Sequence, residues 1–172
     1  YVTVANLKDE DYLDNHYIIM CTKNGIVKKS SLRNYSRPRS NGINAITIRE
    51  GDELLEAKLT DGKKDIMLAK KTGKTIRFDE NDARSMGRTA SGVTGVKLEN
   101  KNDEVVGMIT IADKENDSIL VVSSKGYGKR TNIQEYSRIK RGGKGVKTLS
   151  ITDKTGDLIG LKNVNEDDDL MI

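Results

Sequence analysis

The 172-residue sequence predicts an all-β fold built from propeller-type blades, and three observations support this fold class. An apolar run followed by a glycine-centred turn occurs three times, at a spacing of about fifty residues. The apolar segments are short and rich in Ile, Val and Leu, and none keeps a 3.6-residue period over the length of a helix. Gly, Asn and Asp separate these segments and indicate turns between antiparallel strands.

The first unit is expected at residues 16–63 and sets the pattern. Its opening apolar run precedes a turn at Gly25 and a basic segment, which together predict a hairpin. A second glycine, Gly42, precedes a β-branched residue, and an acidic turn at residues 52–53 leads into the closing apolar run. Four such segments predict four antiparallel strands, which is the content of a propeller blade.

The same pattern recurs in residues 64–116 and 117–167. Residues 1–15 resemble the closing strand and acidic exit turn of a preceding unit, and residues 168–172 resemble the opening of a following one. We therefore expect about three complete blades and parts of two others. Each blade buries its apolar face against its neighbours, so the core should be thin.

Charge is segregated in phase with the repeat. Residues 22–49, 66–98 and 118–152 together carry 22 Lys/Arg and four Asp/Glu, whereas the rest of the chain carries eight Lys/Arg and 22 Asp/Glu. Charges that only keep a protein soluble would be mixed in sign. If the blades surround an axis, their basic halves form a stripe along one edge, which suits a nucleic-acid backbone. An acidic protein partner is the alternative.

Other kinds of site find little support in the sequence. No helix-turn-helix, zinc-finger or basic-zipper pattern is visible, so we expect phosphate contacts rather than readout of base sequence. His16 and Cys21 are the only residues of their types, which excludes a His–Cys metal cluster, and Cys21 is expected to be a small buried hydrophobe. We predict no catalytic residue, no metal site and no cofactor. No run approaches the ~20 apolar residues of a membrane span, so a soluble, cytoplasmic protein is expected.

Residues 138–145, Arg-Ile-Lys-Arg-Gly-Gly-Lys-Gly, resemble the gyrase A box, Gln-Arg-Arg-Gly-Gly-Lys-Gly. Five of its seven positions match, and Ile139 and Lys140 are the departures. Residues 24–29, 85–93 and 126–131 also resemble successive blades of the same domain in order and spacing. Over nearly its whole length the chain is similar to the family of C-terminal domains of bacterial DNA gyrase A.

This resemblance implies a β-pinwheel, a propeller-like disc whose basic outer rim wraps duplex DNA and supports negative supercoiling by an ATP-dependent type II topoisomerase. In that family the DNA-cleaving site lies in the N-terminal portion of gyrase A, so the chain is expected to be non-catalytic. Its partners would be double-stranded DNA, the remainder of gyrase A and the gyrase B protein, at the bacterial nucleoid. The corresponding C-terminal domain of topoisomerase IV and a propeller-like protein-interaction scaffold are the alternatives.

The candidate DNA-binding residues are basic side chains from the three basic segments. They are Lys28, Lys29, Arg33, Arg37, Arg39, Lys74, Arg77, Arg84, Arg88, Lys125, Lys129, Arg130, Arg138, Lys140, Arg141 and Lys144. The box-like loop comprises Ile139, Lys140, Arg141, Gly142, Gly143, Lys144 and Gly145. Its glycines would let backbone N–H groups approach phosphates, while its basic side chains supply charge. Two basic pairs, Lys28-Lys29 and Lys129-Arg130, are expected to project from equivalent strands of two blades.

Overall fold

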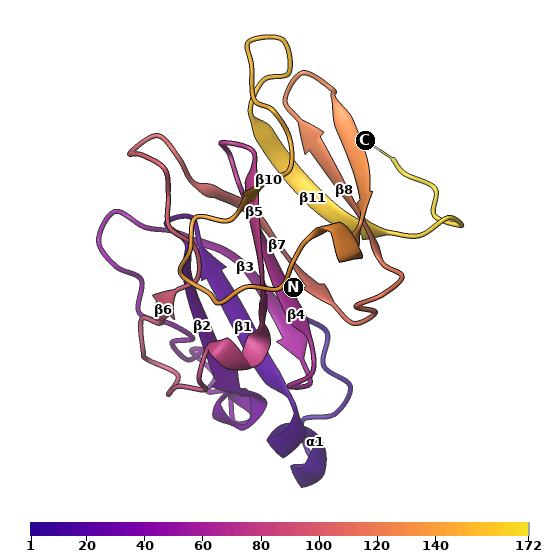
Figure 1. The fold of residues 1–172 in the computed structure, drawn as a ribbon. Coiled ribbons are helices and arrows are strands. Elements are labelled where there is room, and N and C mark those ends of the chain that lie inside the picture. The colour runs from indigo at the N-terminus through magenta and orange to yellow at the C-terminus, as the bar shows by residue number, and fades with distance from the viewer. Residues whose placement is uncertain (172) are drawn as a thin grey trace.

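The computed structural model describes residues 1–171, which form an almost entirely β structure (Figure 1). The elements are α1 (Glu10–Asn15), β1 (Tyr17–Thr22), β2 (Ile26–Ser31), β3 (Leu54–Thr60), β4 (Asp65–Lys70), β5 (Lys74–Asp79), β6 (Val93–Thr94), β7 (Val105–Ile111), β8 (Ser118–Ser123), β9 (Gly128–Asn132), β10 (Val146–Lys147) and β11 (Leu158–Val164). Single 3₁₀ turns follow β2, β5 and β9. None of the helices in residues 1–171 has the length and apolar character needed to span a membrane.

Three antiparallel sheets follow one another along the chain, in the strand orders β3-β1-β2-β6, β10-β5-β4-β7 and β11-β8-β9. Each contains a predicted hairpin, formed by β1 with β2, β4 with β5, and β8 with β9. The closing apolar run of each unit supplies β3, β7 or β11, which pairs with the first hairpin strand. The predicted all-β, blade-like architecture is confirmed.

The closing strands define an inner edge. β3, β7 and β11 occupy the same position in their sheets, and β7 contacts both of the others. The opposite, outer edge carries β2 with β6 and β5 with β10, together with the long loops that precede β6 and β10. The basic segments of the sequence therefore lie toward the outer edge.

The fourth strand of a sheet comes from the following unit. β6 pairs with β2 and β10 pairs with β5, so each joins the sheet of the unit before it. Gly92 and Gly145 directly precede these strands and have φ of 101° and 81°. A Cβ at these positions would lie 2.4 Å from the Val27 carbonyl oxygen and 2.3 Å from that of Thr75. The second glycine of the repeat is required for this close approach.

Strand exchange changes the expected content of a unit. Residues 42–49 of the first unit, which precede its closing strand, form no strand. Their counterparts β6 and β10 join a preceding hairpin, and residues 1–15 contain no hairpin for residues 42–49 to join. Within residues 1–171 the third sheet has three strands, and β9 has no strand paired along its outer side.

The two ends also differ from the expectation. The closing strand expected in residues 1–15 does not form, because residues 10–15 make helix α1 and residues 1–9 contain no strand. The Asp9 carboxylate caps this helix by accepting hydrogen bonds from the N–H groups of Asp11 and Tyr12. Residues 165–171 form no strand either, and Ile172, the last residue of the expected opening segment, lies outside the described residues.

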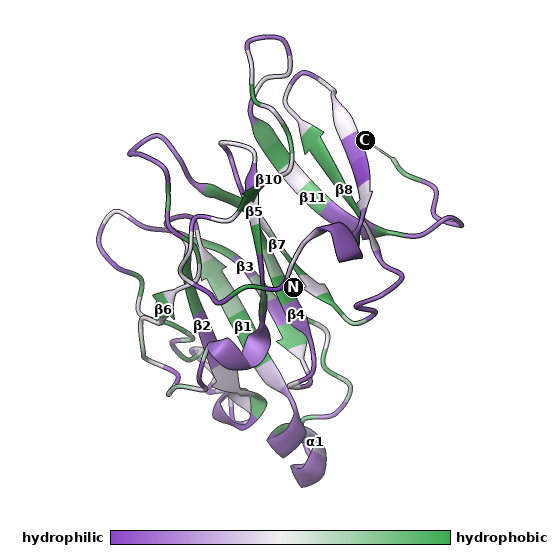
Figure 2. Ribbon diagram, in the orientation of Figure 1, coloured by the Kyte–Doolittle hydropathy of each residue, from purple (hydrophilic) through white to green (hydrophobic). Residues whose placement is uncertain are grey.

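The core consists of apolar layers between neighbouring sheets. Ile66 and Leu68, on one face of β4, pack against residues of the first sheet such as Ile19. Met67 and Ala69, on the other face of β4, pack against the third sheet. This period of two places the second sheet between two apolar layers. Figure 2 shows hydrophobic colour along the central strands and hydrophilic colour along most connecting loops.

Candidate nucleic-acid interface

The sixteen predicted DNA-binding residues fall into three classes by exposure. Ten are exposed, namely Arg33, Arg37, Arg39, Arg84, Lys125, Lys129, Arg130, Arg138, Lys140 and Lys144. The half-buried residues are Lys74, Arg88 and Arg141, and the buried residues are Lys28, Lys29 and Arg77. A contact with a phosphate needs an accessible cationic group, so these classes cannot share one role.

The prediction that Lys28 and Lys29 project into solvent is wrong, because they are 0% and 3% exposed. The Lys28 ammonium donates hydrogen bonds to the carbonyl oxygens of Ala45 and Arg88, and burial lowers its pKa to about 8. The Lys29 ammonium lies 3.0 Å from a carboxylate oxygen of Glu80. Arg88 and Glu80 belong to the second unit, so both lysines tie two units together.

Arg77 is buried for the same reason. Its position in β5 corresponds to that of Lys29 in β2, since both face the third residue of the partner strand. The guanidinium pairs with Asp65 at 2.8 Å and donates to the carbonyl oxygens of Ile133 and Tyr136 at 2.9 and 3.0 Å. Those carbonyls belong to the third unit, so Arg77 is an inter-unit contact and not an accessible cation.

The corresponding residue of β9, Arg130, is exposed. Its guanidinium lies 3.7 Å from the carboxylate of Glu166, and an exposed pair of this kind contributes little to stability. Its neighbour Lys129 is also exposed, as predicted. The third unit thus presents to solvent the basic pair that the first unit buries.

The backbone of the box-like loop is docked on the second unit. The N–H of Gly142 donates to the carbonyl oxygen of Gly95 at 2.6 Å, and the carbonyl oxygen of Gly143 accepts from the N–H of Lys97 at 2.8 Å. The N–H of Gly142 therefore already has a partner in the protein, unlike the free backbone N–H groups expected of this loop. Gly142 and Gly145 adopt positive φ, at 85° and 81°.

Two arginines of this segment also point toward the second unit. Arg141 donates to the carbonyl oxygens of Asp82 and Thr94 at 2.8 and 3.0 Å. The Arg138 guanidinium lies 2.9 Å from the buried carboxylate of Asp65. The box-like loop therefore joins the third unit to the second, and we call this set of contacts between units a staple.

The same staple occurs at the junction of the first and second units. Arg88 stands four residues before the glycine that precedes an exchanged strand, as Arg141 does, and donates to the carbonyl oxygen of Asn44 at 3.0 Å. The N–H of Met86 donates to the carbonyl oxygen of Lys29 at 2.8 Å. This arginine recurs at a fixed distance from the glycine, a signal in the sequence that points to a structural role.

The remaining cations are better placed for a ligand. Arg37, Arg39, Arg84, Lys129 and Lys140 are exposed, and within residues 1–171 their side chains form no ion pair and no hydrogen bond. Arg33 instead pairs with Glu10 and Asp14, and Lys125 donates to the carbonyl oxygen of Asp153. Each of the three units supplies at least one of these five unpaired cations.

A hollow of about 430 Å³ opens between the outer loops of the first two units. Arg39 and Arg88 line it, together with Asn41, Asn44 and Thr89, and no carboxylate is among the lining residues. The arginines and amides are hydrogen-bond donors that suit phosphate oxygens. Another hollow, between the second and third units beside Arg138 and Lys140, also includes Asp79 and Asp82, so its charge is compensated internally.

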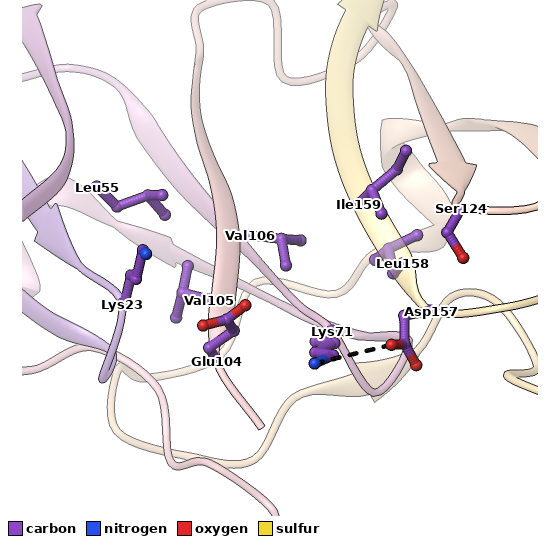
Figure 3. Close-up of a pocket in the computed structure, with 10 residues that line it drawn as sticks. All are labelled: Lys23, Leu55, Lys71, Glu104, Val105, Val106, Ser124, Asp157, Leu158 and Ile159. Carbon is purple, nitrogen blue, oxygen red and sulfur yellow. Dashed lines mark ion pairs between the residues drawn. The ribbon is translucent and has the colours of Figure 1, made fainter. Parts of the chain in front are cut away.

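A different hollow, of about 310 Å³, lies where the inner strands β3, β7 and β11 begin (Figure 3). Lys71 lies 3.8 Å from Asp157 there, and the lining residues Lys23 and Glu104 contribute one further charge of each sign. The rest of the lining is mostly apolar. Balanced charge makes this inner hollow a poor site for a polyanion.

Sequence reasoning missed two exposed lysines beside the box-like loop, Lys97 and Lys147. The register of β10 on β5 places Lys147 directly opposite Lys74, so two cations from different units become neighbours. This proximity depends on the strand exchange, and the spacing of residues in the sequence does not reveal that exchange.

The described residues contain neither a metal-binding cluster nor an accessible thiol. Residues 1–171 hold no group of three His, Cys, Asp or Glu side chains placed to bind a metal ion. Cys21 is fully buried, and burial raises the pKa of its thiol, so the reactive thiolate is disfavoured.

Comparisons with known proteins agree with this architecture. The family model described as "DNA gyrase C-terminal domain, beta-propeller" matches residues 16–61, 64–112 and 117–165. The DNA gyrase A protein of Staphylococcus epidermidis is 42% identical over 171 residues, and that of Staphylococcus aureus is 43% identical over 170 residues. These matches cover 99% of the chain but only 19% of either relative, so the chain spans about a fifth of their length.

Two solved structures share the fold. The C-terminal domain of DNA topoisomerase IV superposes with a TM-score of 0.84 at 27% identity, covering 95% of this chain and 49% of that one. A DNA gyrase A C-terminal domain superposes with a TM-score of 0.76 at 26% identity, covering 90% of this chain and 50% of that one.

Proposed function

Because the chain belongs to the DNA gyrase C-terminal domain family, we propose that it binds duplex DNA along the outer edge of its blades and catalyses no reaction itself. The observation that supports this proposal is the set of five unpaired, exposed cations, Arg37, Arg39, Arg84, Lys129 and Lys140. They are spread over three successive units and lie toward the edge opposite β3, β7 and β11. Exposed Arg and Lys side chains without internal partners can exchange solvent counterions for phosphates.

In this proposal residues 16–63, 64–116 and 117–167 act as successive blades that present one continuous basic edge. Lys74, Lys125, Arg130 and Lys144 reinforce it, although each also has an internal partner. Contacts with phosphates position the duplex without reading its sequence, so binding should tolerate any base sequence. Arg88 and Arg141 fix the outer loops through hydrogen bonds to carbonyl oxygens of the adjoining unit.

A duplex that follows cations on three successive blades must bend. Smooth bending of a 20–30 bp site by 40–90° costs on the order of 1–6 kcal/mol. Phosphate contacts can offset this cost when they are distributed along the curve rather than gathered in one patch. We infer that the domain wraps DNA and thereby supports negative supercoiling by a gyrase holoenzyme.

The holoenzyme supplies what this chain lacks. The rest of gyrase A would cut and rejoin DNA, the gyrase B protein would use ATP, and this domain would determine the path of the duplex at the bacterial nucleoid, in the cytoplasm. These partners are inferred from the relatives, which are proteins about five times as long as the chain.

Salt dependence tests the proposal most simply. Binding of a labelled duplex of about 30 bp is measured by fluorescence anisotropy between about 50 and 200 mM salt, where several phosphate contacts give a steep dependence. Five to seven contacts predict a slope of log K against log salt of roughly −5 to −6. Affinity that is indifferent to salt, or confined to one base sequence, would contradict binding through phosphates.

The topoisomerase IV counterpart is the second candidate, because its C-terminal domain superposes with a TM-score of 0.84. That similarity concerns the fold. The box-like loop and the named relatives favour gyrase. The topoisomerase IV counterpart is expected to bind DNA without strong wrapping. A topological assay therefore separates the two candidates, since binding without wrapping leaves the linking number unchanged.

A further inference from the structure

Three ammonium groups converge on one carboxylate at the junction of the second and third units. Lys70 and Lys74 each place Nζ 2.9 Å from Oε1 of Glu99. Lys144, from the box-like loop, places Nζ 3.8 Å from Oε2 of the same side chain. The cluster therefore joins the ends of β4 and β5 to a loop of the next unit.

The three lysines differ in access to solvent. The Lys70 side chain is 0% exposed, those of Lys74 and Lys144 are 35% and 62% exposed, and that of Glu99 is 21% exposed. Lys70 also donates to the carbonyl oxygen of Lys97 at 2.8 Å, so it has a partner besides Glu99. The hydrogen bonds from Lys74 and Lys70 lower the pKa of Glu99 to about 2, which keeps it ionised at neutral pH. A ligand can reach Lys74 and Lys144 but not Lys70.

The cluster is not a requirement of the fold. Where the second unit has Lys70, the first and third units have Thr22 and Ser123, each paired with the start of its own closing strand. Neither of those units has an acidic residue at the position of Glu99, seven residues after the second repeat glycine. Among the residues that the structure describes, the arrangement occurs once, beside cations that the proposed function assigns to DNA.

Resting on that proposed function, we propose that Glu99 is an internal counter-anion that occupies a phosphate seat formed by Lys74 and Lys144. A DNA phosphate has the same charge and the same kind of acceptor oxygens as a carboxylate. It can engage these lysines only by sharing them with Glu99 or by displacing it. Glu99 therefore weakens binding at this junction and favours release of the duplex.

The variant Glu99→Gln tests this directly. It keeps the shape of the side chain, removes the competing charge and leaves Lys70 its backbone partner. We expect duplex affinity to rise roughly threefold to tenfold at about 100 mM salt, from loss of one like charge near a phosphate. The salt slope should steepen by about 1 to 2, because two lysines become available. Glu115→Gln, which removes an exposed acidic group outside this cluster, is the matched control and should leave both values unchanged.

The outcomes separate the two proposals. If the wild-type domain binds DNA with steep salt dependence and a folded Glu99→Gln variant binds no more tightly, the role of Glu99 is refuted while the proposed function stands. If the wild-type domain does not bind duplex DNA, both fail. In a Lys74→Gln/Lys144→Gln background the gain from Glu99→Gln should disappear, and a gain that persists would show a general charge effect instead.

A second measurement uses the unaltered protein, in case Glu99→Gln does not fold. Lysine acetylation read by mass spectrometry should show that saturating duplex protects Lys74 and Lys144. The exposed Lys101 is the control and should stay reactive. If Lys74 and Lys144 are acetylated as fast in the complex as in the free domain, they do not face DNA and the phosphate seat is refuted.

Discussion

Strands β2 and β9 occupy the same place in the repeat, yet their basic pairs have opposite environments. Lys28 and Lys29 of β2 are buried, and the outer segment of the second unit supplies them with partners, the Arg88 carbonyl oxygen and the Glu80 carboxylate. Lys129 and Arg130 of β9 are exposed, and in residues 1–171 no strand pairs along the outer side of β9. Within residues 1–171, a basic residue at this place of the repeat therefore joins two units where the next unit covers it, and is exposed where the described residues supply no cover.

The largest expected effect comes from removing a covered cation. Lys29→Met should destabilise the domain by about 3–5 kcal/mol, because Glu80 is fully buried and would lose its ionic partner. Urea unfolding measures this loss. Arg130→Met, at the equivalent position of β9, is the control and should change stability by no more than ~0.5 kcal/mol. Equal losses of stability for the two substitutions would contradict the distinction drawn between β2 and β9.

A smaller loss is expected at the staple. Arg141→Ala leaves the carbonyl oxygens of Asp82 and Thr94 without this donor and should cost about 1–3 kcal/mol. Lys140→Ala, one residue away and exposed, should leave the unfolding midpoint nearly unchanged. A stable Arg141→Ala variant that loses DNA affinity would instead place its guanidinium on DNA.

The buried Lys28 predicts a pH effect. Its pKa is about 8 in the folded chain and about 10.4 in an unfolded one, so between these values the unfolded state binds more protons. Stability should therefore rise with pH through this window, since the cost of burying the charge disappears as Lys28 deprotonates. Comparing urea unfolding of the wild type with that of Lys28→Met between about pH 7 and 10 isolates this effect. If the unfolding free energies of the two proteins change with pH in parallel, burial does not lower the pKa of Lys28.

The smallest effect on stability is expected for the exposed basic pair of β9, whose replacement should instead weaken DNA binding. Lys129→Glu with Arg130→Glu should alter stability by only ~0.5 kcal/mol per substitution, because both side chains are exposed. It should reduce the salt slope of DNA binding by about 2, one unit for each lost phosphate contact. A marked fall in the unfolding midpoint would show that the basic pair of β9 stabilises the fold as the basic pair of β2 does.

Sequence reasoning could predict the blades because the evidence for them is local. Turn glycines such as Gly25 and Gly73, and short β-branched runs, specify hairpins within a few residues. The charge segregation likewise identified segments that contain exposed cations, Arg39 and Lys140 among them.

The environment of each cation could not be predicted in this way. Glu80, the ionic partner of Lys29, and the carbonyl partners of Arg77 lie in the next unit, 51 and more than 50 residues further along the chain, and only the packing of neighbouring units brings them into contact. Arg141 fits a phosphate-binding motif in the sequence, but in the structure its donors bind carbonyl oxygens. A contact across two units is set by the packing of sheets, and the charge pattern carries no information about that packing.

The central claim is that exposed cations on successive blades bend the duplex along an arc, and the linking number tests it most directly. A nicked plasmid is sealed by ligase with the domain bound, and its topoisomers are then resolved on a gel. The account predicts a shift of one sign that grows with added protein, and a smaller shift for Lys129→Glu with Arg130→Glu. An unchanged topoisomer distribution at protein concentrations that saturate the DNA would contradict wrapping.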